Sequence, residues 1–391
     1  MSFWRAARAA LVWKKQVLGI SSLLGVVVFA ALLVSCAGDK QVPVFGQHQN
    51  AYVTLPGQNS VLLMQINTIT GEMTSVGQTP QILGTAPQGL ALMNKFLYVA
   101  NTQANSISLF NIATDGSLSQ SGPATPTASG PYALVIDPTG KYLLVSNSLS
   151  GNVSVFSIDS SSGALTAVAG SPFFTGGQNP GEMLMPASGD LLYVSDAGSG
   201  IVTAFTFSNT TGVLTRVGSP NYSGAGAAGL AVDSSGSYLY VANASAVNNP
   251  PNSIGNISGF NINRTAGPSY GSLSAITGSP FTSIAGSGPT HLVLASNGNF
   301  LFATTSGAAY SVWAFSIGET GALTPTINSP FSVQSGNLFA LIDSTGGFLY
   351  IGSSTGIQGY TYDQNTGQPT IVTDSPFSTN GTSPGKMVIS P

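Results

Sequence analysis

Four kinds of short apolar segment follow one another in a fixed order, and the set recurs about every 47 residues along the chain. The most regular segment reads Leu-Tyr-Val-Ala-Asn at 97–101, and related segments begin at 51, 143, 192, 239, 301 and 349. An apolar strand opened by Pro or a small residue precedes all but the first of these, as at 131–136, and an alternating strand such as 153–158 follows. Alternation of apolar and polar residues indicates strands with one buried face. The pattern therefore predicts seven units of four strands.

Repetition at this spacing is typical of β-propellers, in which four-stranded sheets surround a central axis. The two ends of the repeat region complement each other, because the first unit begins at its second strand near Tyr52 and residues 384–389 form a lone first strand. Together they would complete one blade and close the ring, which removes exposed sheet edges. A linear β-solenoid, the alternative, would not need such complementary ends. We therefore expect an all-β, seven-bladed β-propeller over residues 48–391, with four strands per blade.

The N-terminus has the pattern of an export signal. A basic segment through Lys15 precedes the apolar run 17–34, which ends at Leu-Val-Ser followed by Cys36. This ending resembles the lipobox of bacterial lipoproteins, in which the Cys is acylated and becomes the first mature residue. An uncleaved membrane anchor is the alternative, since about 18 apolar residues can just span a bilayer. We expect a signal peptide at 1–35, lipidation of Cys36 and a linker at 36–47.

Either form of the N-terminus places the rest of the chain outside the cytoplasm. The expected location is the outer membrane or the periplasm, with membrane contact through the lipid anchor.

Charge and composition exclude several classes of function. Only 6% of the residues are charged, against roughly 25% in ordinary soluble proteins. Because no basic stripe is available to neutralise phosphates, nucleic acid is not expected as a partner. Two His residues and one Cys give no transition-metal ligand set, and no EF-hand spacing is present. We therefore expect neither a metal nor a cofactor.

One position of the repeat holds three ionisable side chains. Aligning the seven inner strands puts Glu182, His291 and Lys386 in one column, near the start of each strand and hence around the mouth of the central channel. There His291 could act as general base or acid, Glu182 could orient it, and Lys386 could bind an anionic or carbonyl oxygen. Alternatively, the three side chains satisfy one another as a structural polar ring between blades.

The repeat, with its Pro-x-x start, Leu-Tyr-Val-Ala-Asn strand and Thr-Gly-x-Leu turn, resembles the lactonase-type seven-bladed propellers of the 6-phosphogluconolactonase and carboxymuconate cyclase family. The resemblance covers the whole repeat region and implies lactone hydrolysis. His291, which ends a Gly-Pro-Thr-His segment, matches a His of the family, but Thr290 stands in place of the Arg before it. The family's second His-bearing segment is Pro-Tyr-Ala-Leu at 131–134 here, and Thr-Thr-Ser at 304–306 replaces its Glu.

One insertion distinguishes the fifth unit. The interval from Tyr240 to Phe302 is 62 residues, where the other intervals run 46 to 49. Part of the excess falls at 244–256, which is rich in Asn and Pro and joins a second strand to a third, on the same face as the mouth of the channel. A long loop there is suited to partner specificity, and drift in an exposed loop is the alternative.

These observations favour a non-catalytic, envelope-anchored propeller that binds a glycan, a peptide or an envelope protein. A lactone hydrolase of the resembled family is the alternative, with His291, Glu182 and Lys386 as its catalytic residues.

Overall fold

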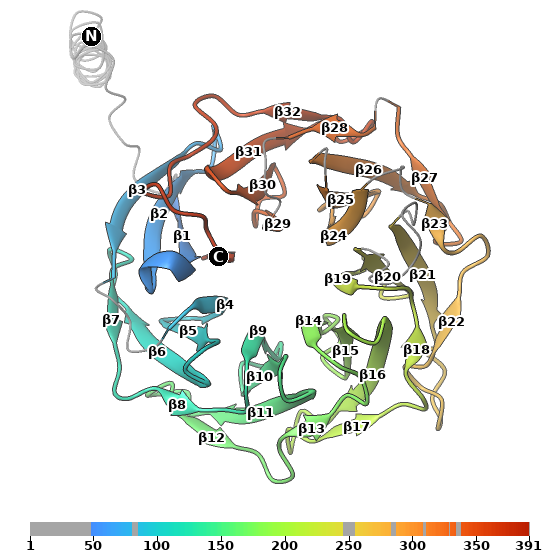
Figure 1. The fold of residues 1–391 in the computed structure, drawn as a ribbon, viewed down its shortest axis with the longest axis horizontal. Coiled ribbons are helices and arrows are strands. Elements are labelled where there is room, and N and C mark those ends of the chain that lie inside the picture. The colour runs from blue at the N-terminus through green and yellow to red at the C-terminus, as the bar shows by residue number, and fades with distance from the viewer. Residues whose placement is uncertain are drawn as a thin grey trace, which may run out of the picture. The chain divides into compact units, whose positions relative to one another are not determined.

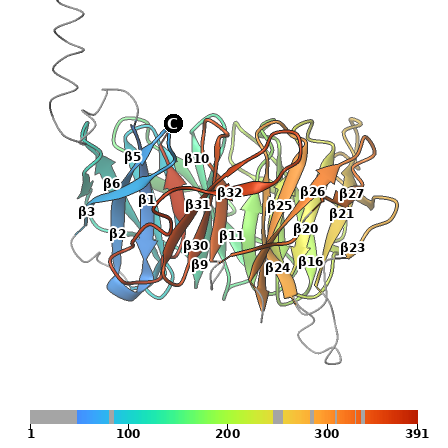
Figure 2. The same cartoon turned by 90° about the horizontal axis from the view of Figure 1, so that it is seen from above.

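The computed structural model describes residues 48–79, 85–244, 255–282, 287–307, 310–327, 329–333 and 338–390. These residues form seven antiparallel sheets that stand around a common axis as the blades of a propeller (Figure 1). Seen from the side, the strands run between the two faces of the ring (Figure 2). The expected all-β, seven-bladed fold is therefore confirmed.

The expected signal peptide at 1–35, the lipidated Cys36 and the linker at 36–47 lie outside the described residues. Positions 245–254 of the inserted loop do so as well. Among the residues that the structure describes, no helix is long and apolar enough to cross a bilayer. Export and lipidation stay predictions.

In each blade the first strand lies nearest the axis (Figure 1). Blade 1 has β33 (Met387–Ile389), β1 (His48–Leu55), β2 (Ser60–Asn67) and β3 (Met73–Gln78), with the 3₁₀ turn η1 (Pro56–Gln58) between β1 and β2. Blade 2 has β4 (Pro87–Met93), β5 (Phe96–Asn101), β6 (Ser106–Ile112) and β7 (Leu118–Gln120). Blade 3 has β9 (Pro131–Ile136), β10 (Tyr142–Asn147), β11 (Asn152–Ile158) and β12 (Leu165–Ala167).

The remaining blades repeat this order. Blade 4 has β14 (Pro180–Leu184), β15 (Leu191–Asp196), β16 (Ile201–Phe207) and β17 (Leu214–Arg216). Blade 5 has β19 (Ala227–Val232), β20 (Tyr238–Asn243), β21 (Asn256–Ile262) and β22 (Leu273–Ala275). Blade 6 has β24 (Ser287–Leu294), β25 (Phe300–Gly307), β26 (Ser311–Ile317) and β27 (Leu323–Pro325). Blade 7 has β29 (Phe339–Ile342), β30 (Phe348–Ser353), β31 (Gly356–Tyr362) and β32 (Pro369–Ile371).

Five blades carry a short fifth segment in addition to the four expected strands. It pairs with the third strand of its own blade, and its copies are β8 (Thr125–Pro126), β13 (Phe173–Phe174), β18 (Asn221–Tyr222), β23 (Phe281–Thr282) and β28 (Phe331–Ser332). The recurring Ser-Pro-Phe sequence leads into three of these segments, namely β13, β23 and β28. Its Ser hydroxyl accepts a hydrogen bond from the middle of the third strand, as where Ser171 Oγ accepts from Val155 N at 2.9 Å.

The ring closes as the two ends of the repeat predicted. β33 pairs antiparallel with β1, with Val53 opposite Met387, and Thr54 N donates to Lys386 O at 2.9 Å. Closure covers the inner edge of β1, which would otherwise be unpaired, and β33 becomes the innermost strand of blade 1. It also places Lys386 beside an innermost strand, at the wall of the channel.

Neighbouring blades adhere through apolar cores and through a repeated polar contact. Each of the seven buried apolar clusters combines residues of two adjacent blades. The Tyr of the Leu-Tyr-Val motif also reaches into the next blade. Tyr98, for example, donates its hydroxyl at 2.8 Å to the carbonyl of Gly163, whose φ of +72° belongs to the turn before the fourth strand. The motif therefore joins blades as well as filling the core.

The inner strands are irregular near their first residues. In blades 2 to 6 the pairing of the first and second strands shifts register after the opening Pro or small residue, as between Pro180 and Met183. The first strand carries one extra residue there, which is a β-bulge. Bulges redirect side chains, and these five lie at the mouth of the channel where the ionisable column was expected.

Candidate functional site

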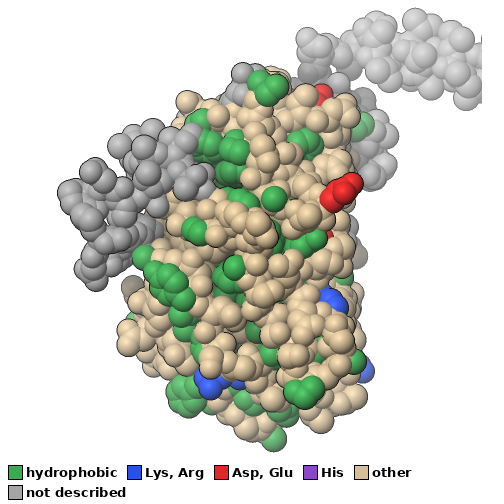
Figure 3. Space-filling view, turned by 90° about the vertical axis from the view of Figure 1, so that its right-hand side faces the viewer, with side chains coloured by type: hydrophobic (Ala, Val, Ile, Leu, Met, Phe, Trp, Pro, Cys, Tyr) green, Lys and Arg blue, Asp and Glu red, His purple; other side chains and the backbone are tan. Residues whose placement is uncertain are grey.

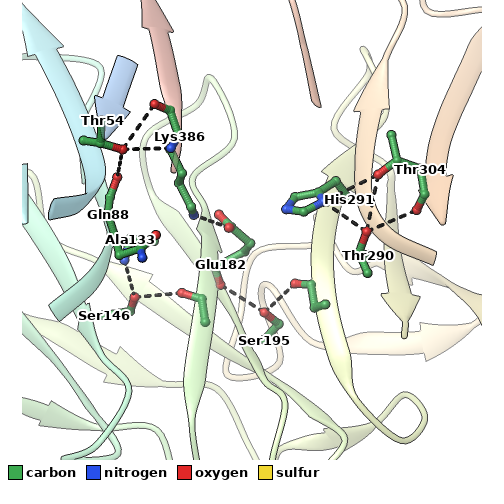
Figure 4. Close-up of polar contacts among 12 residues, drawn as sticks. Thr54, Gln88, Ala133, Ser146, Glu182, Ser195, Thr290, His291, Thr304 and Lys386 are labelled. Atoms are coloured by element: carbon green, nitrogen blue, oxygen red, sulfur yellow. Dashed lines mark hydrogen bonds and ion pairs between the residues drawn. The ribbon is translucent and has the colours of Figure 1, made fainter. Parts of the chain in front are cut away.

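An ion pair links opposite sides of the channel. The Lys386 ammonium, from blade 1, contacts Glu182 Oε1, from blade 4 (Figure 4). The side chains are 16% and 25% exposed, respectively, so the pair is largely shielded from bulk water. An attraction between opposite charges is much stronger in such a setting than at an open surface.

The pair holds both groups in their charged forms. Burial by itself raises the pKa of Glu182, but the Lys386 charge and then His291 outweigh it, so that this pKa lies below its usual range. Burial likewise lowers the pKa of Lys386, and the Glu182 carboxylate reverses the shift and raises it. At neutral pH the site therefore contains one carboxylate and one ammonium.

His291 completes the constellation from blade 6. Thr290 Oγ1 lies 3.1 Å from His291 Nδ1 and donates its own proton to Thr304 O at 3.3 Å. Thr304 Oγ1 also lies 3.5 Å from His291 Nδ1. When Thr290 donates to Thr304 O, its oxygen can accept a proton from Nδ1, and in that tautomer the lone pair of the ring is on Nε2. Among the described residues, Nε2 has no hydrogen-bond partner. Burial lowers the pKa of His291 to about 4, against a smaller opposing effect of Glu182, so the ring is neutral at pH 7.

Hydroxyl side chains of the second strands hold the bulges in place. Ser146 Oγ accepts from Ala133 N at 3.0 Å and donates to the Gly181 carbonyl of the next blade at 2.7 Å. The Ser195 hydroxyl donates a hydrogen bond shared between the carbonyl oxygens of Glu182 and Ala228, at 3.3 and 2.7 Å. The backbone on both sides of Glu182 is therefore fixed (Figure 4).

Lys386 is held in the same way. Its backbone N donates to Thr54 Oγ1 at 2.8 Å, and that hydroxyl donates to Gln88 O in blade 2 at 3.0 Å. The ammonium therefore extends from a backbone segment, just before β33, that is restrained by blade 1 and by its neighbour, blade 2.

Tyr132 belongs to the site, and the sequence alignment overlooked it. The Lys386 ammonium lies 4.4 Å from the centre of its ring, in the range of a cation–π contact. Tyr132 precedes the aligned column by one position, at the bulge of β9, where regular alternation no longer predicts which side chain reaches the channel. The sequence feature that could have pointed to Tyr132 is the large size of its side chain, since the corresponding residues in blades 4 and 5 are Gly181 and Ala228.

Three cavities follow one another along the channel. The outer chamber, of about 410 Å³, is lined by Tyr132, Ser148, Asn179, Pro180, Gly181, Glu182, Ala197, Ala227, Ala228, Thr290 and His291. The inner cavity, of about 190 Å³, shares Glu182 and His291 with it and adds Lys386. A third cavity of about 700 Å³ shares Leu341 and Met387 with the inner cavity and lies at the opposite ends of the inner strands. Glu182 and His291 therefore stand at the junction of the two cavities nearest the channel mouth.

The structure thus brings together Glu182, His291 and Lys386. All three line the channel, and Glu182 and Lys386 also satisfy one another as the polar-ring interpretation expected. Their catalytic roles stay predictions. The base of the inserted loop lies close to this site, because Gly288, three residues before His291, packs against the carbonyl of Ala244. Among the described residues, no group of three or more His, Cys, Asp or Glu could hold a metal ion.

Comparisons with known proteins agree with the geometry. The structure is similar to a putative 6-phosphogluconolactonase from Bacteroides fragilis, at 21% identity and a TM-score of 0.71, over 89% of this chain and 100% of that one. It is similar to another from Bacteroides uniformis, at 16% identity, a TM-score of 0.72 and coverage of 88% and 100%. It also resembles the periplasmic gluconolactonase of Pseudomonas aeruginosa, at 17% identity, a TM-score of 0.70 and coverage of 88% and 99%.

At these identities the structural likeness establishes the fold alone, and no curated protein sequence matches the chain. The family assignment comes from the sequence. The model of the family described as lactonase, 7-bladed beta-propeller, matches residues 43–173 and 169–263, which together exceed half of the chain. The chain therefore belongs to the lactonase family of seven-bladed β-propellers.

Proposed function

We propose that this protein hydrolyses a lactone at the junction of the outer chamber and the inner cavity. The observation that carries the proposal is that a neutral imidazole, His291, and an ammonium, Lys386, line the same inner cavity, with no hydrogen-bond partner on His291 Nε2 among the described residues. Membership of the lactonase family supports it. The proposal reverses the preference drawn from the sequence, which favoured binding without chemistry.

His291 acts as the general base in the proposed reaction. Its Nε2 takes a proton from a water molecule while the water oxygen adds to the lactone carbonyl carbon. The charge that develops on the carbonyl oxygen is stabilised by a hydrogen bond from the Lys386 ammonium. The ring C–O bond then breaks, and the imidazolium returns its proton to the departing alkoxide oxygen. The product is a hydroxy acid, which releases its carboxyl proton to solvent.

Glu182 and Tyr132 support this chemistry without touching the reacting carbon. The Glu182 carboxylate keeps Lys386 protonated, and its negative charge favours the imidazolium that forms on His291. The Tyr132 ring covers one side of the ammonium and restricts where that group can point.

A ligand-binding propeller without chemistry is the second candidate. The mutual satisfaction of Glu182 and Lys386 favours it, because a structural ion pair needs no substrate. The two candidates differ in what they require of His291.

Replacement of each histidine in turn separates the candidates. Full-length protein in detergent is assayed against a panel of lactones by the acid released. His291→Ala should lower kcat/KM at least 100-fold, since general acid–base catalysis contributes roughly 10²–10⁴ in rate. His48→Ala, which alters an exposed residue at the start of β1, should match the unaltered protein. Equal rates for His291→Ala and the unaltered protein, or no turnover of any lactone, would leave the binding module as the better account.

A further inference from the structure

Positive charge is scarce at the candidate site. The repeat region from 48 to 391 contains five cationic residues in its whole sequence, namely Lys95, Lys141, Arg216, Arg264 and Lys386. Figure 3 shows how thinly charge is spread over one face of the molecule. Of the five, Lys386 alone lines the outer chamber or the inner cavity. Arg264 pairs with Asp190 at 3.7 Å, in the turn after β14, which lies at the far ends of the inner strands.

The charge of the one cation at the site is already balanced, although an ammonium keeps further N–H donors for a carbonyl oxygen. Lys386 is paired with Glu182 and faces Tyr132. The carboxylate and the ammonium cancel, and a neutral His291 adds no charge. A phosphate group binds where several cationic or charge-assisted donors converge, most effectively on Arg. Here Thr290 occupies the place before His291, and its hydroxyl already bonds Thr304.

The outer chamber has mostly apolar walls. The surface of the chamber is mostly apolar, and its lining includes Tyr132, Pro180 and the three alanines Ala197, Ala227 and Ala228 beside the polar Ser148, Asn179, Glu182, Thr290 and His291. A ligand that fills such a space gains most by burying hydrocarbon against these walls while a single polar group meets the base.

We infer that the outer chamber takes an uncharged lactone with a non-polar substituent, and that it disfavours lactones that carry a phosphate group. The inference rests on the proposed function for the reaction, but it concerns the part of the substrate that does not react. It also separates this protein from the putative 6-phosphogluconolactonases that share its fold.

A comparison of kcat/KM for three lactones, each assayed separately, tests the inference. δ-Decanolactone, glucono-δ-lactone and 6-phosphoglucono-δ-lactone are each offered to full-length protein, and kcat/KM is measured. We expect δ-decanolactone to exceed the phosphorylated lactone at least tenfold, with the unphosphorylated sugar between them. Equal or reversed values for the first and third would overturn the inference and leave lactone hydrolysis standing.

A charge variant at the chamber wall provides a second arm. Ala197 is partly exposed and lies outside the proposed catalytic groups. Ala197→Arg should raise the ratio of kcat/KM for the phosphorylated lactone over δ-decanolactone about tenfold. Ala197→Met, which is long but uncharged, should not raise it. An equal effect of the two variants would show that charge is not what the chamber selects.

Binding keeps the inference testable if no lactone is hydrolysed. The lactams that correspond to δ-decanolactone and 6-phosphoglucono-δ-lactone cannot react by ring opening, and their binding is measured by titration calorimetry. Binding of the alkyl lactam with weaker or absent binding of the phosphorylated lactam supports the inference even if the proposed reaction is wrong. Preference for the phosphorylated lactam, or binding of neither, overturns it.

Discussion

At the scale of single residues, a buried carboxyl group stands where three other blades have an amide. Asn101, Asn147 and Asn243 each end a second strand and donate from Nδ2 to a Ser hydroxyl of the third strand, at 2.9 to 3.0 Å. Blade 4 has Asp196 at this position, fully buried, with hydrogen bonds from Thr175 and Thr203 at 2.7 and 3.2 Å. No cation pairs with it among the described residues. Burial therefore raises the pKa of Asp196 to about 6.

Asp196→Asn should stabilise the protein at neutral pH. Because the pKa of Asp196 is higher in the folded than in the unfolded state, its stabilising contribution is complete below pH 4 and is lost as the pH rises through 6. A shift of about two units corresponds to about 3 kcal/mol. Urea unfolding at pH 7.5 should show a gain of up to about that size, and the gain should shrink below pH 4. Asn147→Asp is the matched control, which should introduce the same pH dependence in blade 3. A variant no more stable than the original at pH 7.5 would contradict this account.

At the scale of the strand, the Leu-Tyr-Val motif shows why its Tyr recurs. In five blades its hydroxyl donates to a Gly carbonyl in the next blade, at 2.8 to 3.3 Å, through Tyr52, Tyr98, Tyr193, Tyr240 and Tyr350. Blades 3 and 6 have Leu144 and Phe302 instead, so the apolar contact alone can hold a blade interface. The hydroxyl adds one hydrogen bond to an interface between blades that apolar packing already holds together.

Removing that hydroxyl should lower the free energy of unfolding of the propeller by a small amount that is about the same at each blade interface. Tyr98→Phe leaves the buried Gly163 carbonyl without its partner, which should lower the free energy of unfolding by about 1 kcal/mol. Tyr240→Phe, three interfaces away from the contact between blades 2 and 3, should cost about the same, and the double variant should show the sum. Tyr222→Phe is the control, because that ring is 72% exposed. Equal free energies of unfolding for Tyr98→Phe and Tyr222→Phe, measured by denaturant titration, would contradict this prediction.

Strand periodicity also sets how much of the site could be predicted. Glu182, His291 and Lys386 share a position in the repeat, so aligning the strands places them at one height without coordinates. Tyr132 could not be found in this way, because it stands one position before the aligned column, where regular alternation would turn its side chain away from the channel. The short fifth segments were missed for a related reason, since two residues such as 173–174 are too few to show any period.

At the scale of the whole molecule, ring closure converts a linear repeat into a site. Lys386 and Glu182 are separated by 204 positions in the chain, and they meet only because β33 pairs with β1 and seven blades complete a circle. The sequence predicted the closure from its complementary ends. The width of the channel and the burial of each group decide which of the three ionisable side chains pair and which remains neutral. Neither quantity can be predicted from the repeat pattern.

The central claim is that a half-buried, neutral His291 is the base of a lactone hydrolase. The pH dependence of kcat/KM, measured from pH 3 to 8 and corrected for spontaneous ring opening, tests it most directly. Because a base must be unprotonated to act, and burial holds the pKa of His291 at about 4, activity should rise with a midpoint near pH 4 and stay level from pH 5 to 8. A midpoint near the ordinary pKa of 6.5, or a profile without any acid limb, would contradict the account.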